Sequence, residues 1–135
     1  MWTWMPHSAH LIVGYDCDFH LATEVGGYLV STVGEYFPDS QVREIIAKSK
    51  NVKLEGIGDR RRFDFYKKIG YVEIGLGRLY ETLVFESSKS GEKCCLFKMK
   101  TSKEVDFRGY NTAGDAYNGH MELCKKWSTG RCVLE

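Results

Sequence analysis

The chain has 135 residues, of which 43% are hydrophobic and 13% aromatic, and its 19 Lys and Arg nearly balance 18 Asp and Glu. So many large apolar residues supply a core, which excludes an intrinsically disordered protein. The net charge of +1 excludes the strongly basic surface of proteins that bind DNA mainly through its phosphates. No segment approaches the ~20 apolar residues of a membrane-spanning helix, and no secretory signal pattern opens the chain. We therefore expect one compact domain over residues 1–135 in a reducing cytoplasm, with the five cysteines as free thiols.

The first part of the chain predicts strands joined by a tight turn. Residues 10–15 form a short apolar run with a β-branched centre, which is typical of a strand. Residues 19–25 alternate between two faces, a second extended run covers residues 28–33, and only Gly26 and Gly27 separate these two runs. Because glycine readily adopts the positive φ angles of two-residue turns, we expect the two runs to form a β-hairpin.

The middle of the chain, about residues 39–70, predicts a helical insertion. Pro38 breaks the preceding strand and Ser40 is a candidate N-cap, after which apolar residues recur at helical spacing over residues 42–49. A second short helix is predicted over residues 59–69, where apolar side chains recur before a glycine.

After the insertion the sequence returns to strands. Residues 80–86 carry the strongest strand signal, because β-branched and aromatic residues dominate there. Weaker runs at residues 71–74, 94–98 and 105–110 predict further strands, with a polar hairpin loop over residues 87–93.

The last predicted element is a helix that starts at Thr112, with Asp115 three residues later in a pattern similar to a capping box. One face of a sheet needs a cover, and this amphipathic helix can supply it. The predicted fold class is therefore α+β, a mainly antiparallel sheet covered by a C-terminal amphipathic helix, with the helical insertion in mid-chain. The apolar stripe of the helix consists of Ala113, Ala116, Tyr117, His120, Cys124 and Trp127.

Strand alternation points to a candidate ligand site. If the face of Leu83 and Phe85 is the core, Glu81 points inward at one end of the strand, where a carboxylate needs a partner such as Arg78. Inward carboxylates often mark binding sites, but a structural ion pair with ordinary capping residues explains the same pattern. The predicted site is a cleft between the sheet edge and the last helix, lined by Arg78, Glu81, Ser31, Thr32, Asn111 and His120.

A metal site is the alternative arrangement. Cys17 and His20 are three residues apart, and His120 and Cys124 have the i, i+4 spacing that places two ligands on one side of a helix. Two such pairs could close a tetrahedral zinc site, although a packed thiol and a hydrogen-bonded core imidazole are the more common outcome for such residues. We expect no cofactor. A small enzyme that uses these His and Cys residues stays open as an alternative function.

One short segment resembles an enzyme family. Residues 65–71, FYKKIGY, are similar to the F-Y-x-K-x-G-[FY] segment of GNAT acetyltransferases. Those enzymes also carry an [RQ]-x-x-G-x-[GA] turn that opens a long helix upstream, and residues 36–62 supply no such turn and helix. Acetyl transfer is therefore the least favoured alternative.

Three further stretches resemble small uncharacterised proteins of tailed bacteriophages and prophages. Residues 78–85, RLYETLVF, are similar to an R-x-Y-E-T-[ML]-V-F motif, and residues 110–127 are similar to a Y-N-T…G-H…W motif. Residues 30–34, VSTVG, are similar to a stretch that precedes both motifs. The resemblance implies a phage or prophage origin, the cytoplasm of a bacterial host, and no known activity.

The function expected from these observations is binding rather than catalysis. By analogy with other small accessory phage proteins, we expect a non-enzymatic protein that binds a bacterial host protein or a small anionic, nucleotide-like ligand. A homodimer is possible if Trp2, Trp4 and Met5 form an exposed apolar patch.

Overall fold

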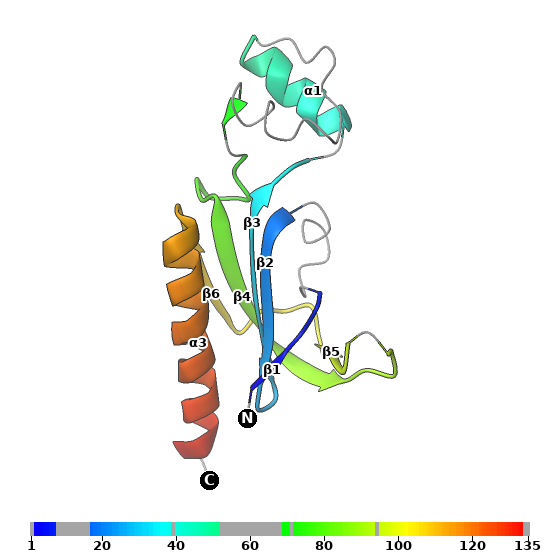
Figure 1. Cartoon of the computed structure of the whole chain (residues 1–135), viewed down its shortest axis with the longest axis vertical. Helices are drawn as coiled ribbons and strands as arrows, with labels where there is room; N and C mark the ends of the chain where they lie inside the picture. Colours follow the sequence, from blue (N-terminus) through cyan, green and yellow to red (C-terminus); the bar gives the residue numbers. More distant parts are fainter. Residues whose placement is uncertain are drawn as a thin grey trace.

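The computed structural model describes residues 2–7, 17–38, 40–51, 69–70, 72–93 and 95–133. In these residues one antiparallel sheet carries a long C-terminal helix on one face, which confirms the predicted α+β class (Figure 1). The strands follow the order β1-β2-β3-β4-β5, and β6 also pairs with β4. The elements are β1 (Trp2–Trp4), β2 (Cys17–Val25), β3 (Tyr28–Tyr36), α1 (Ser40–Ser49), β4 (Tyr80–Lys89), β5 (Phe97–Met99), β6 (Asp106–Tyr110) and α3 (Ala113–Val133).

The predicted hairpin is confirmed as β2 and β3. Gly26 and Gly27 form its turn with φ angles of 69° and 106°, which side chains with a Cβ rarely adopt. The register pairs Thr23 with Val30, and β3 in turn pairs with β4 so that Thr32 lies opposite Thr82. The three central strands are therefore held in one register by the turn and by long-range pairing.

Helix α3 covers the face of the sheet that carries Tyr80, Thr82 and Val84, and not the face of Leu83 that the sequence analysis assigned to the core. The face of Leu83 and Phe85 is buried as well, because Phe85, Leu29 and Val33 are at most 4% exposed. Both faces therefore contribute to the core, and on the face under α3 the buried Thr82 has its hydroxyl hydrogen-bonded. The contacts under α3 form two clusters. One contains Val25, Val30, Val84, Leu123 and Cys124, with Trp2, Tyr28 and Trp127 against it; the other contains Tyr80, Tyr110 and Ala116, with Phe19, Leu79 and Ala113.

Two aromatic rings in this layer lie directly on glycines. The ring of Tyr110 occupies the space that a Cβ at Gly119 of α3 would need, and the ring of Tyr80 does the same at Gly34 of β3. The absence of a side chain at Gly119 therefore lets α3 approach β6 closely.

The capping of α3 is confirmed, and its apolar stripe is confirmed in part. The backbone N–H of Asp115 donates to Thr112 Oγ1 over 3.1 Å. His120 and Cys124 are fully buried, but Tyr117 is 51% exposed, and Leu123 takes the core position that the stripe omitted. None of the described helices is long and apolar enough to span a membrane.

Other elements differ from their predicted bounds. The helix of residues 42–49 is confirmed as α1, and the strand of residues 80–86 is longer, because β4 continues to Lys89. Residues 72–79 form an isolated bridge and a tight turn instead of a strand. The predicted strand at residues 10–15 lies outside the described residues, as does all but the last residue of the helix predicted over residues 59–69.

Candidate functional site

A chain of buried polar groups lies between α3 and the sheet, centred on His120. The His120 side chain is 0% exposed, and both of its ring nitrogens have partners. Nε2 lies 2.8 Å from Thr23 Oγ1 on β2, and Nδ1 lies 2.7 Å from Thr32 Oγ1 on β3. One histidine of α3 thus joins the helix to two neighbouring strands.

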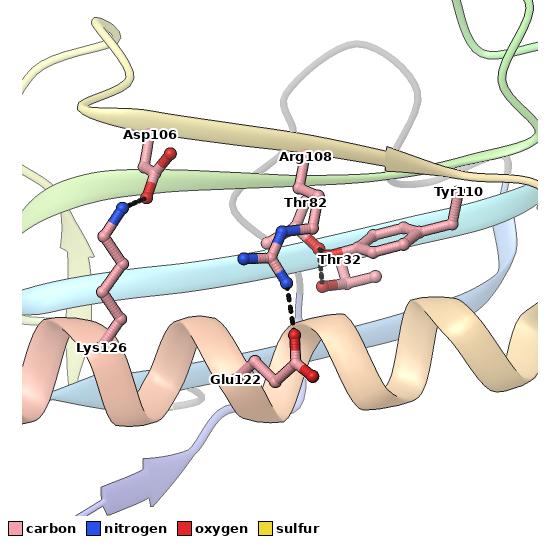
Figure 2. Close-up of polar contacts among 7 residues, drawn as sticks. All are labelled: Thr32, Thr82, Asp106, Arg108, Tyr110, Glu122 and Lys126. Carbon is pink, nitrogen blue, oxygen red and sulfur yellow. Dashed lines mark hydrogen bonds and ion pairs between the residues drawn. The ribbon is translucent and has the colours of Figure 1, made fainter.

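The chain continues across β4 to β6. Thr32 Oγ1 lies 2.6 Å from Thr82 Oγ1, and Thr82 Oγ1 lies 3.0 Å from the hydroxyl of Tyr110 (Figure 2). Thr32 lies on β3, Thr82 lies opposite it on β4, and Tyr110 lies on β6, the other neighbour of β4. The polar chain therefore crosses the sheet from β2 to β6 under the helix.

The pKa shifts indicate a direction for these hydrogen bonds. Burial lowers the pKa of His120 from 6.5 to about 4, so the ring is neutral and carries one N–H. Burial raises the pKa of Cys124 to about 11, and a hydrogen bond from Thr23 acts in the opposite direction. If the Thr23 hydroxyl donates to Cys124, the oxygen of Thr23 accepts from His120 Nε2–H, and His120 Nδ1 then accepts from the Thr32 hydroxyl.

A continuous proton order follows. With the proton on Nε2, Tyr110 donates to Thr82, Thr82 to Thr32, and Thr32 to His120, so each hydroxyl proton along the chain is used once; the other tautomer reverses this order. Burial raises the pKa of Tyr110, although its hydrogen bond with Thr82 lowers it, and the phenol stays protonated at neutral pH. Chains of this kind strengthen each bond by polarisation, and a missing member leaves buried polar groups unsatisfied.

The polar chain is closed to solvent on the side of β1. The ring of Trp4 stacks on His120 with 5.7 Å between the ring centroids and 28° between the planes. A neutral imidazole with both nitrogens bonded and a pKa of about 4 is a poor proton acceptor for a bound molecule at pH 7. The arrangement is suited to fixing α3 on the sheet.

A second polar row joins α3 to β6 at the edge of the sheet (Figure 2). Lys126 Nζ lies 2.8 Å from Asp106 Oδ2, which also accepts from Trp127 Nε1 over 3.0 Å. Arg108 and Glu122 form an ion pair of 2.7 Å. Burial raises the pKa of Asp106, but its hydrogen bonds to Lys126 and Trp127 outweigh that effect and lower it overall.

The structure brings together only part of the predicted ligand site. Thr32 and His120 are hydrogen-bonded to each other beneath α3. Ser31 is also buried, but it neighbours Thr32 in the strand and so belongs to the opposite face of the sheet. Glu81 lies on that opposite face too, paired with Val33 and Gly109. The expected shared cleft of Glu81 and His120 is therefore wrong, because the sheet separates them.

Arg78 and Asn111 lie together at the exposed start of β4. Asn111 Oδ1 accepts from the backbone N–H of Leu79 over 3.3 Å. The aliphatic part of Arg78 lies against Gly109, where a Cβ would come within 2.7 Å of Arg78 Cγ. This contact holds the stem of an exposed arginine against β6.

A tight turn directly precedes these residues, and we call residues 74–78 the Leu76 turn. Arg78 N donates to Gly75 O over 2.9 Å, which closes a four-residue turn. Leu76 and Gly77 occupy its centre with φ angles of 52° and 72°. Leu76 is 87% exposed. Positive φ at both central residues is typical of a type I′ turn, which prefers Asn-Gly.

The predicted zinc site does not assemble. Among the described residues, which include Cys17, His20, His120 and Cys124, no group of three or more His, Cys, Asp or Glu side chains could hold a metal ion. Cys17 and His20 lie three apart on β2 and so point to opposite faces of the sheet, and the nitrogens of His120 are bonded to threonines. Cys17, Cys95 and Cys124 are not joined in disulfides within the described part of the chain.

Sequence reasoning missed Thr23, Thr82, Tyr110 and Leu76. The alternation over residues 19–25 puts Thr23 on the same face as Phe19 and Val25, and inward threonines on neighbouring strands are a usable signal for a buried hydroxyl chain. Gly75-Leu76-Gly77 is a second usable signal, because glycines on both sides of a residue indicate a tight turn.

A scan against known protein families finds no matching model, and searches of curated proteins and of solved structures find no significant match.

Proposed function

We propose that this chain is a non-enzymatic accessory protein of phage type that binds a bacterial host protein through the Leu76 turn. The observation that carries the proposal is the conformation of Leu76, a bulky apolar residue with a φ of 52° and 87% exposure. The buried polar chain supports a role as scaffold, because it fixes α3 to the strands that present the turn.

The conformation of Leu76 is unfavourable for the isolated chain. A left-handed backbone costs a residue with a Cβ roughly 1–2 kcal/mol, and Asn or Gly would fill this position at lower cost. A side chain that is 87% exposed recovers little of that cost through burial. Strained residues that the fold does not need are typical of binding sites, so a partner that buries the leucine explains its presence.

The surroundings favour a protein partner over a small ligand. The leucine projects from the turn, which suits insertion into an apolar pocket of another protein. Arg78, at the base of the same turn, presents a cation that would meet an acidic side chain at the edge of that pocket. Asn111 anchors Leu79 and so fixes the direction of the turn relative to β6.

The test compares Leu76→Asn with Ile45→Asn, which changes another exposed apolar residue, on α1, with 67% exposure. Each protein is immobilised and used to capture proteins from bacterial lysate. We expect Leu76→Asn to raise the free energy of unfolding by about 0.5–1 kcal/mol and to lose a partner that wild type and Ile45→Asn retain. No retained partner with wild type, or equal retention by both variants, would contradict the proposal.

A further inference from the structure

Strand β6 forms an edge of the sheet. In the described part of the chain it pairs with residues 80–84 of β4 and with no other strand. Its five residues, DFRGY, contain neither proline nor lysine, which many proteins use to block pairing at an edge. The backbone N–H of Phe107 donates to Asp106 Oδ1 over 2.8 Å, so a strand added at this edge would exchange that local bond for one to its own backbone.

Apolar side chains lie on the face of β6 that α3 does not cover. Phe107 is 45% exposed and Val105, two residues before it, is 40% exposed. Phe107 is paired with the half-buried Leu83 of β4, so the apolar surface continues onto the sheet. Exposed aromatic residues at a sheet edge are suited to cross-strand contacts with a partner.

The other face of β6 carries one charge of each sign. Asp106 is paired with Lys126 of α3 over 2.8 Å, and Arg108 is paired with Glu122 over 2.7 Å. Asp106 and Arg108 are two residues apart, so they flank Phe107 in the strand and share the face beneath α3. This pattern is self-complementary about Phe107.

We infer that β6 pairs with β6 of a second copy of this chain, in an antiparallel dimer whose two-fold axis passes through Phe107. In that register Asp106 of each copy lies opposite Arg108 of the other. The internal ion pairs then extend into a row of alternating charge, from Lys126 to Asp106, and on to Arg108 and Glu122 of the second copy. The two Phe107 rings meet on the opposite face.

The charges select this register over its neighbours. A two-fold axis through Arg108 would place the two Arg108 side chains opposite each other, and an axis through Asp106 would do the same with the two carboxylates. Like charges directly opposite in a β-ladder are destabilising, whereas opposite charges are favourable. Moving the axis by one residue, which slips the register by two, thus replaces two attractions with one repulsion.

The experiment exchanges the charges while keeping each internal ion pair. One double variant carries Arg108→Glu and Glu122→Arg, and the other carries Asp106→Lys and Lys126→Asp. In a dimer of either variant with itself, like charges face each other across the axis. When the two variants are mixed, every facing pair is again of opposite sign.

Sedimentation equilibrium on the full chain, at concentrations up to about 1 mM, measures the molecular mass of each protein in solution. We expect wild type to approach twice 15.5 kDa, each double variant alone to stay near 15.5 kDa, and the equimolar mixture to recover the dimer mass. A wild type that is monomeric throughout, or two double variants that each dimerise alone as well as wild type, would overturn the inference.

A second pair of variants covers the case in which a charge exchange disturbs folding. Phe107→Asp places two carboxylates at the axis and should abolish the dimer, whereas Leu96→Asp, a change at another exposed apolar residue outside β6, should not. Dimerisation that survives Phe107→Asp would overturn the inference. Leu76→Asn should leave the dimer mass unchanged, so failure here and failure of the proposed function are distinguishable.

Discussion

Replacing Gly119 with alanine is expected to destabilise the protein, although alanine is the better helix former. In an open position the change would raise the free energy of unfolding by about 1 kcal/mol. At Gly119 the new methyl group would lie inside the ring of Tyr110, so the ring or the helix must move. Overpacking of this kind costs about 1–3 kcal/mol.

Movement of the Tyr110 ring also breaks its 3.0 Å hydrogen bond to Thr82 and leaves buried hydroxyls unsatisfied. That loss costs a further 1–3 kcal/mol or so, which gives a net destabilisation of about 1–5 kcal/mol for Gly119→Ala. Gly114 is the matched control, because it lies in the same helix and a Cβ there meets nothing within 4 Å. We expect Gly114→Ala to be neutral or stabilising by up to about 1 kcal/mol.

Urea unfolding at pH 7, followed by far-ultraviolet circular dichroism, measures both variants against wild type. The informative quantity is the sign of the change in each variant, because helix propensity alone raises stability in both. A Gly119→Ala variant at least as stable as wild type would refute the close packing of Tyr110 on α3.

Three further results are expected. Thr82→Val should cost about 1–3 kcal/mol of stability, because it removes the hydrogen bonds of residue 82 to Tyr110 and to Thr32, although Thr32 keeps its bond to His120. Thr82→Ser keeps the hydroxyl and should cost less; urea unfolding would contradict this if valine were the better tolerated residue. The pKa of His120 is about 4 when folded and 6.5 when unfolded, so the unfolded chain binds more protons between these pH values. The free energy of unfolding should therefore rise by up to about 3 kcal/mol from pH 4 to 6.5, and His120→Gln should lose this rise. Equal pH dependence of stability in wild type and His120→Gln would contradict the burial of the ring. With a pKa of about 11, Cys124 is about one part in a thousand thiolate at pH 8, so iodoacetamide should modify it far more slowly than Cys95. Equal rates of modification of the two cysteines, measured by mass spectrometry, would contradict the burial of Cys124 under α3.

The local elements could be predicted from the sequence because their signals are local. Gly26 and Gly27 specify the hairpin turn by their φ angles, and Thr112 marks the start of α3 through a bond to a residue three positions away. The alternation over residues 19–25 also groups Thr23 with Phe19 and Val25 on one face. Each of these predictions needed only neighbouring residues.

The polar chain could not be assembled in the same way, because its bonds join distant residues. Thr23 and His120 are 97 positions apart, and Thr32 and Thr82 are 50 positions apart. Only the register of β2, β3 and β4 places these hydroxyls in one row, and a slip by one residue would move them to the other face. The same limit explains why Glu81 was expected beside His120.

The Leu76 turn shows a different limit. Strand propensity predicts an extended run over residues 71–74, but the bridge of Val72 to Tyr36 ends there and the chain turns back at Gly75. The flanking glycines indicate a tight turn, but leucine is a poor indicator of a positive φ, so its place at the centre of a type I′ turn could not be predicted.

Nitrogen-15 spectroscopy of the histidine rings at pH 7 tests the closed polar chain most directly. We expect His120 to give the two well-separated nitrogen shifts of a single neutral tautomer, with the proton on Nε2 and slow exchange of that proton with water. Averaged nitrogen shifts and fast exchange, or protonation of the ring near pH 6.5, would contradict a sealed histidine bonded at both nitrogens.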